Sequence, residues 1–140
     1  MDYKRILLAL IFALASTGAM AEWAKLRSYG EKSDYASNTQ YVDFYSLHKD
    51  GSMVDILDLT DFDSEQLTMP FGGKNFLSIT RKYMLDCTNK RYRVLDASWF
   101  SGNMGRGDIV SRYSDGDWSK MDNADYIHEE TLWEVACGKN

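Results

Sequence analysis

Positive charge is concentrated in one short stretch of this otherwise acidic chain. Five basic residues lie within thirteen positions, namely Arg81, Lys82, Lys90, Arg91 and Arg93. The 140 residues together carry a formal charge of -5 at pH 7. A local excess of positive charge attracts acidic partners and speeds their encounter. The stretch is therefore a candidate binding site for an acidic protein surface or a sulfated glycan.

Aromatic side chains would accompany this charge. In the hairpin register predicted below, one face of the sheet carries the candidate ligand-binding residues Lys82, Arg91, Arg93 and Trp99. Aromatic residues beside arginines are typical of the hot spots of protein interfaces. The face could therefore bind a partner protein or a second copy of the chain. The alternative is a solvated hairpin whose positive charges are neutralised by Asp86 and Asp96.

No other group of residues in the sequence is typical of catalysis or of metal binding. The two histidines, His48 and His128, lie outside any nucleophile motif such as Gly-x-Ser-x-Gly. The carboxylates of Asp61, Asp63 and Glu65 could offer oxygen ligands to calcium. A calcium loop also needs a central glycine and a glutamate at its twelfth position, and both are missing. We therefore expect a non-enzymatic domain without a metal or cofactor, with a small hydrolase as an alternative.

The first 21 residues have the pattern of a cleaved signal peptide. A basic pair precedes ten consecutive apolar residues, 6–15, and residues 19–21 have the small-x-small pattern that signal peptidase recognises. Ten apolar residues are too few to cross a bilayer, which needs about 20. We place the cleavage after Ala21, which leaves residues 22–140 as a single domain. An uncleaved membrane anchor is the alternative.

The mature chain is expected to be exported and acidic. Loss of residues 1–21 removes two basic residues and one acidic residue, so the formal charge changes from -5 to -6. With a pI of about 4.9, the chain lacks the basic field of a nucleic-acid-binding protein. No cysteine follows the cleavage site for lipid attachment, and no later apolar run is long enough to span a membrane. We expect a periplasmic or secreted protein without a lipid anchor.

The two cysteines, Cys87 and Cys137, both belong to the mature part. An even count in an oxidising compartment predicts a disulfide bond. Their separation of 50 positions differs from the ligand spacing of a zinc site, and the sequence has no Cys-x-x-Cys motif. Closing a loop of this length is worth about 4 kcal/mol in the chain-entropy model. That is a large share of the roughly 5 to 15 kcal/mol that keeps a domain folded.

Most of the mature chain alternates apolar and polar residues as strands do. Six runs have this pattern: 23–30, 40–48, 53–62, 75–87, 90–100 and 108–113. The Asp50-Gly51 pair between the second and third runs is a strong hairpin signal. Short turns between successive strands favour an antiparallel meander. Residues 63–74 are predicted to form its longest loop.

The hairpin around Thr88 and Asn89 favours one register. The residues predicted to face each other are Asp86 and Arg91, Leu85 and Tyr92, Tyr83 and Val94, and Arg81 and Asp96. Two opposite-charge pairs and two apolar pairs thus form together, each contributing about 0.2 to 1 kcal/mol. A shift of one residue would lose all four. The face that carries Tyr83, Leu85 and Cys87 is predicted to be the covered one.

The C-terminal segment is predicted to cover that face as a helix. An Asp-Asn pair can cap its start near residue 124, Gly138 suits its end, and Trp133 and Cys137 fall on one apolar stripe. The competing prediction makes residues 131–137 a seventh strand. The preferred fold class is α+β: an antiparallel sheet of about six strands with a C-terminal helix packed on one face. A Cys87–Cys137 disulfide would tether that helix.

Several short motifs follow one another along the mature chain. They are Tyr41-Val42-Asp43, Leu59-Thr60-Asp61, Asp86-Cys87, the glycine-rich residues 101–107, Trp118 and Cys137. In this order, and with a central Asp-Cys paired with a terminal cysteine, residues 23–137 resemble the surface-adhesin protein E-like domains of Gram-negative bacteria. The resemblance implies a sheet of about six strands with a disulfide-tethered helix. It also implies binding of host extracellular-matrix and serum proteins.

The sequence therefore predicts an exported non-catalytic binding domain that resembles surface-adhesin protein E. Its ligand would be a protein or a polyanion, and a host matrix or serum protein if the domain is displayed on the cell surface. The alternative is a periplasmic structural or assembly partner of another envelope protein. A homodimer is a further possibility, since the basic and aromatic face could pack against its own copy.

Overall fold

The computed structural model describes residues 21–30, 36–68, 73–121 and 127–138. The predicted signal peptide up to residue 20 and the first residues of the predicted C-terminal helix lie outside these ranges. The side chains of residues 127 and 128 also lie outside the description.

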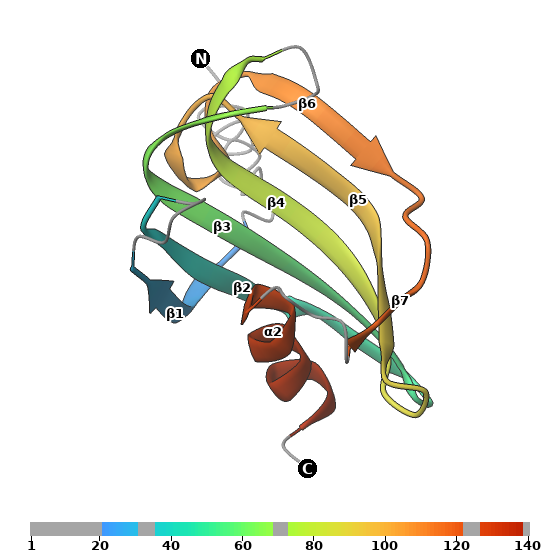
Figure 1. Ribbon diagram of the computed structural model, residues 1–140. Coiled ribbons are helices and arrows are strands. Elements are labelled where there is room, and N and C mark those ends of the chain that lie inside the picture. The colour runs from blue at the N-terminus through green and yellow to red at the C-terminus, as the bar shows by residue number, and fades with distance from the viewer. Residues whose placement is uncertain (1–20, 31–35, 69–72, 122–126, 139–140) are drawn as a thin grey trace, which may run out of the picture.

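The described residues form one antiparallel sheet and one α-helix (Figure 1). The strands are β1 (Trp23–Tyr29), β2 (Asn38–Asp50), β3 (Met53–Leu67), β4 (Asn75–Asp86), β5 (Arg91–Phe100), β6 (Ile109–Ser114) and β7 (Ser119–Lys120). The strands β1 to β6 are neighbours in chain order, and β7 pairs with β5. A single 3-10 turn, η1 (Asn103–Gly105), lies between β5 and β6, and α2 (Ile127–Cys137) follows β7. The predicted antiparallel meander is confirmed.

The C-terminal segment is a helix, so the alternative of a seventh strand over residues 131–137 is wrong. Two glutamates, Glu129 and Glu130, lie in the first turn of α2, where the helix dipole favours negative charge. At the other end, the Gly138 N–H donates a hydrogen bond of 3.0 Å to the Glu134 carbonyl. Gly138 has a φ of 87°, a conformation that glycine adopts without a steric cost. The helix therefore ends where a glycine permits it.

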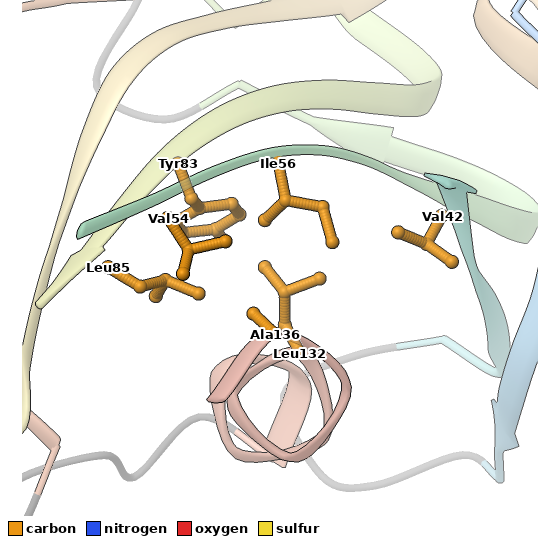
Figure 2. Packing of buried hydrophobic residues seen from close by; sticks show 7 residues of the cluster. All are labelled: Val42, Val54, Ile56, Tyr83, Leu85, Leu132 and Ala136. Atoms are coloured by element: carbon orange, nitrogen blue, oxygen red, sulfur yellow. The ribbon is translucent and has the colours of Figure 1, made fainter. Parts of the chain in front are cut away.

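The hydrophobic core lies between α2 and one face of the curved sheet, which we call the helix face (Figures 1 and 2). The sheet contributes the buried residues Val42, Val54, Ile56, Tyr83 and Leu85, and α2 contributes Leu132 and Ala136. These seven side chains come from β2, β3, β4 and α2 and point toward one another (Figure 2). The opposite face of the sheet, here called the outer face, is not covered by α2.

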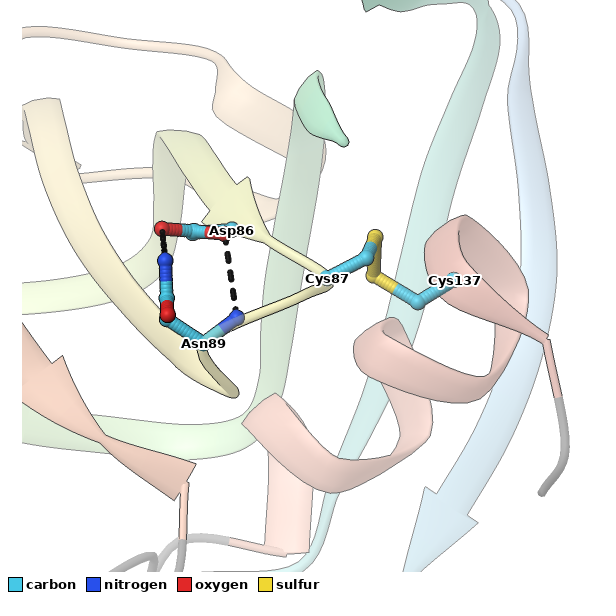
Figure 3. The surroundings of a disulfide bond; sticks show 4 residues. All are labelled: Asp86, Cys87, Asn89 and Cys137. Carbon is cyan, nitrogen blue, oxygen red and sulfur yellow. Dashed lines mark hydrogen bonds between the residues drawn. A yellow bond between two sulfur atoms is a disulfide. The ribbon is translucent and has the colours of Figure 1, made fainter. Parts of the chain in front are cut away.

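The disulfide joins the C-terminal end of α2 to the turn between β4 and β5 (Figure 3). Cys87 is the first residue after β4, and Cys137 is the last residue of α2. The turn itself is fixed by Asp86, whose carboxylate accepts hydrogen bonds from the backbone N–H of Asn89 at 3.2 Å and from its side-chain amide at 2.8 Å. The predicted Cys87–Cys137 bond is confirmed, and it attaches the helix to an ordered part of the sheet.

The β4–β5 hairpin has the predicted register only in the half next to its turn. There Asp86 faces Arg91, Leu85 faces Tyr92 and Tyr83 faces Val94. Farther from the turn the register shifts by one residue, so that Lys82 faces Asp96 and Arg81 faces Ala97. The predicted pair of Arg81 with Asp96 is therefore wrong. A β-bulge in β5 causes the shift, because one extra residue moves every later side chain to the other face.

The loop between β5 and β6 packs onto the outer face of the sheet. The buried Ser78 hydroxyl donates a hydrogen bond to the Gly102 carbonyl at 2.6 Å and accepts one from the Gly105 N–H at 2.9 Å. Gly105 has a φ of 70°, and an added Cβ would lie 3.5 Å from the Leu59 side chain. Close contact with β3 and β4 thus explains a glycine at this position. The loop covers the part of the outer face that is farthest from the β4–β5 turn.

Candidate functional site

Three of the candidate ligand-binding residues lie on the outer face, toward the β4–β5 turn. Arg93 faces Met84 across the hairpin, and Arg91 faces Asp86. Lys82 is two positions from Met84 on β4 and therefore lies on the same face. The geometry thus brings Lys82, Arg91 and Arg93 together on one surface.

Trp99, the fourth candidate, lies on the opposite face. It faces Ile79, which shares the helix face with Tyr83 and Leu85 because alternate residues of a strand point the same way. The predicted placement of Trp99 beside the basic residues is therefore wrong. The bulge in β5 is the reason, since it lies between Val94 and Asp96 and reverses the side on which the rest of β5 projects.

A different tryptophan, Trp118, accompanies the arginines. The Arg91 guanidinium carbon lies 4.4 Å from the centroid of the Trp118 ring, and that of Arg93 lies 5.7 Å from it. Both distances are typical of cation–π contacts, and tryptophan is the best aromatic partner for them. Trp118 reaches this place because the short strand β7 pairs Ser119 with Tyr92. A strand of two residues is too short to show the alternation of a strand, which is why the sequence pattern missed the contact.

Arg91 is held in place from two sides. Its Nε lies 2.9 Å from Oδ2 of Asp86, and its side chain is 42% exposed. Hydrogen bonds from the Asn89 side chain and backbone, together with the bond and charge of Arg91, lower the pKa of the Asp86 carboxyl. Asp86 therefore stays ionised and keeps Arg91 next to Trp118. The predicted neutralisation by Asp86 is correct for Arg91.

Exposed lysines surround this pair of arginines. Lys82, Lys90 and Lys120 are all exposed, and Lys120 faces Arg91 directly across β5 and β7. Like charges that face each other across strands are unfavourable, so this edge of the sheet is an attractive place for an anion. We call Lys82, Lys90, Arg91, Arg93 and Lys120, with Trp118, the basic cluster. Lys120 and Trp118 are its members that sequence reasoning missed.

The three carboxylates considered as calcium ligands are used within the fold. Asp61 Oδ1 accepts hydrogen bonds from the Asn103 side-chain amide at 3.1 Å and from the Met104 N–H at 2.7 Å. Asp63 accepts a hydrogen bond from the Ser37 hydroxyl, and Glu65 accepts one from the Asn75 amide at 3.1 Å. Asp61 thus anchors η1, while the other two connect neighbouring segments. Of the two histidines, His48 is exposed on β2.

A buried polar network lies under the N-terminal half of α2, on the helix face. Asp58 is fully buried, and its carboxylate accepts hydrogen bonds from Arg81 Nε and Nη2, both at 3.1 Å. Asp58 Oδ2 also accepts one from the Gln40 amide at 3.0 Å, and Arg81 Nη2 donates to the Thr60 hydroxyl at 2.6 Å. This network joins β2, β3 and β4. Arg81 thus pairs with Asp58 on β3 and not with Asp96.

Tyrosines extend this network toward α2 and β1. The Tyr83 hydroxyl donates a hydrogen bond to Glu129 Oε1 at 3.1 Å, and the Arg81 guanidinium carbon lies 5.6 Å from the Tyr83 ring centroid. Tyr29 of β1 contacts Gln40 and Thr131 through its hydroxyl, at 3.2 and 2.9 Å. Each strand from β1 to β4 therefore contributes a polar side chain to the region below α2.

Burial and paired charges shift the pKa values in this region. Burial raises the pKa of the Tyr83 hydroxyl well above its ordinary value, although the charge of Arg81 acts in the other direction. Burial, the largest single cause, would lower the pKa of Arg81, but the attraction of Asp58, Tyr83 and Glu129 and the hydrogen bond to Asp58 together outweigh it and raise that pKa. Arg81 is therefore a fixed positive charge, and Tyr83 is a neutral hydrogen-bond donor.

These features define a binding domain: a sheet, stiffened by a tethered helix on one face, presents a charged surface with a stacked tryptophan on the other. The sequence profile of the surface-adhesin protein E family matches residues 23–138, so the chain belongs to that family. Membership implies an exported, adhesin-like binding domain, and it favours binding over catalysis. No helix among the described residues is long and apolar enough to cross a membrane.

Solved structures of Haemophilus influenzae protein E have the same fold. Crystal form II matches with a TM-score of 0.51 and 16% identity, over 81% of this chain and 95% of that one. The selenomethionine form matches with a TM-score of 0.52 and 15% identity, over 82% and 97%. Identities this low show a shared fold alone. No curated protein sequence matches this chain.

Proposed function

We propose that this chain is an exported, non-catalytic binding domain that recognises an acidic ligand through the basic cluster. Residues 1–21 would be its signal peptide, and residues 22–140 its single domain, without a lipid anchor. The observation that carries the proposal is the stacking of two arginines on Trp118 beside three exposed lysines. The ligand would be a sulfated glycan or an acidic surface of a host matrix or serum protein.

The arrangement supports ligand binding for a physical reason. Stacking on Trp118 orders Arg91 and Arg93 before any ligand arrives, so less side-chain entropy is lost on binding. Arg93 Nε is buried and has no hydrogen-bond partner among the described residues. The exposed lysines can contact acidic groups as point charges. An acidic protein with such a local basic surface would bind in a salt-dependent way.

Charge reversal at the exposed lysines tests the proposal. The variant Lys82→Glu, Lys90→Glu, Lys120→Glu is expected to bind heparin about tenfold more weakly, a loss of about 1.4 kcal/mol. The control variant Lys25→Glu, Lys49→Glu, Lys74→Glu changes the net charge equally at exposed sites on other strands and loops. Its affinity should fall much less. Biosensor titrations at two salt concentrations measure the heparin affinity of both variants. Equal losses of affinity would refute the basic cluster as the site.

A second candidate function is docking onto another envelope protein, and an exposed aromatic pair favours it. Phe44 and Tyr45 of β2 are 51% and 84% exposed. They lie in a large bulge of β2, between the residue pairs Asp43–Leu57 and His48–Asp55. The Asp43 carboxylate accepts a hydrogen bond from the Tyr45 N–H at 3.0 Å, so the bulge is held in one shape. A fixed, exposed tyrosine is a typical anchor of a protein interface.

Crosslinking in whole cells tests this second candidate. We expect the variant Tyr45→Ala to lose most of the crosslinked product, because truncation of an interface anchor costs about 2 kcal/mol or more. The matched variant Tyr113→Ala, on the exposed part of β6, should retain it. Mass spectrometry of the product distinguishes an envelope protein from a second copy of this chain. Equal yields from the parent and Tyr45→Ala would contradict the assignment.

A further inference from the structure

The two halves of α2 contact the sheet in different ways. The C-terminal half is held by the apolar side chains of Leu132 and Ala136 and by the disulfide at Cys137 (Figures 2 and 3). The described contacts of the N-terminal half are polar and are made by Glu129 and Thr131. The attachment of the N-terminal half therefore depends on the chemistry of these polar groups.

Glu129 is an acidic residue whose hydrogen bonding is incomplete. Glu129 is only 7% exposed, and its Oε1 accepts the hydrogen bond from the Tyr83 hydroxyl. Oε2 is buried and has no hydrogen-bond partner among the described residues. A buried carboxylate with an unpaired oxygen is costly when it is charged, and the cost falls when it is protonated.

The charged groups around Glu129 do not remove this cost. Arg81 of β4 is the cation that acts on it, but the guanidinium is already bonded to Asp58 of β3 and to Thr60. Burial raises the pKa of Glu129. The attraction of Arg81 and the hydrogen bonds from its own backbone N–H and from Tyr83 oppose the rise, and Asp58 adds to it. Tyr29 of β1 is neutral and has a raised pKa of its own. On α2 itself, Glu130 and Glu134 are exposed.

We propose that α2 is a proton-dependent latch. Protonation of Glu129 fastens the N-terminal half of α2 to the sheet, and ionisation of Glu129 releases it while the disulfide retains the C-terminal end. Release uncovers the hydroxyl of Tyr83 and the buried ion pair of Asp58 with Arg81. The domain would therefore present a different surface in acidic and in neutral surroundings.

The direction of the pH dependence follows from linkage. The pKa of Glu129 is higher in the fastened state than in the released state, so the fastened state binds the proton more tightly. Its stabilisation is complete below the ordinary pKa of a glutamate and is lost as the pH rises through the raised value. One proton changes the equilibrium by at most about tenfold per pH unit.

Amide hydrogen exchange of the mature, disulfide-bonded chain tests the latch. The useful amides are those of residues 131–133, since the first four N–H groups of a helix lack an intrahelical partner. Between about pH 5 and pH 8, their protection in the parent should fall about tenfold or more beyond the intrinsic change in exchange rate. The amides of β3 and β4 should keep their protection over the same pH range. A parent protection factor that does not change with pH would overturn the proposal.

Two variants separate the latch from general stability effects. Glu129→Gln cannot ionise, so its protection should not depend on pH, whereas Glu130→Gln, an equal charge change at the exposed neighbour, should behave as the parent does. Tyr83→Phe removes a hydrogen bond that stabilises the ionised, fastened form, so its protection should fall further than that of the parent at the upper end of the pH range. A pH response of Glu129→Gln equal to that of the parent, or a fall in Tyr83→Phe no larger than in the parent, would refute the role of Glu129.

Discussion

Loss of both cysteines, in the variant Cys87→Ala with Cys137→Ala, is expected to lower the free energy of unfolding by about 4 kcal/mol. The cysteines are 50 positions apart, so their bond removes the closure entropy of a long loop from the unfolded chain. The bond also retains α2, whose eleven residues would form a marginal helix in water alone. For a domain of this size the melting temperature should fall by roughly 12 to 20 °C.

Urea denaturation of three samples measures this effect. The oxidised parent, the parent with reductant and the double variant should give two midpoints, because the last two samples both lack the bond. Agreement between the reduced parent and the variant shows that the small side chains of the variant cause no extra loss. An oxidised and a reduced parent that unfold at the same urea concentration would contradict the prediction. The helix would then be held by its non-covalent contacts alone.

The order of the elements could be predicted because its signals are local. Alternation and turn residues such as Asp50-Gly51 depend on neighbours in the chain, and the hairpin there joins β2 and β3 as expected. The main error in length is β3, which extends to Leu67 and not to Phe62. A wide bulge interrupts its pairing with β4 between Asp61 and Gln66, and pairing then resumes. Such a bulge breaks the alternation that marks a strand.

The placement of Trp99 failed for a related reason. One extra residue in β5 reverses the sides of all later residues, and nothing in residues 94–96, which include no glycine, announces it. The basic residues nearest the turn were placed correctly, because the pairing of Arg91 with Asp86 precedes the bulge. Predicting Trp118 as their aromatic partner would have required the position of β7, a strand of two residues.

The partner of Arg81 could not be chosen from the sequence. Asp96 and Asp58 both carry the required charge, and the predicted hairpin favoured the one nearer in the chain. Asp58 lies 23 positions away and meets Arg81 only because β3 and β4 are adjacent on the helix face. Such contacts depend on which strands pair with each other. A single sequence carries no direct signal for that pairing.

Arg81→Met is expected to lower the free energy of unfolding by about 3 to 5 kcal/mol. Asp58 is fully buried, and the substitution would leave its charge with only the Gln40 amide as a hydrogen-bond donor of those described here. Methionine has a similar length and no charge, so packing should change little. Arg91→Met is the matched control. Arg91 is 42% exposed and its partner Asp86 keeps its bonds to Asn89, so we expect a much smaller loss.

The double variant Asp58→Leu with Arg81→Met separates the pair from its unpaired halves. Since it leaves neither member of the pair as an unpaired buried charge, it should recover most of the stability that Arg81→Met loses. The recovery should be incomplete, because Gln40 loses its acceptor and Thr60 loses its donor. Urea denaturation of the single and double variants measures the loss and its recovery as free energies of unfolding. A double variant no more stable than Arg81→Met would show that the ion pair itself stabilises this domain, and that the polar region under α2 is more than a means of avoiding unpaired charge.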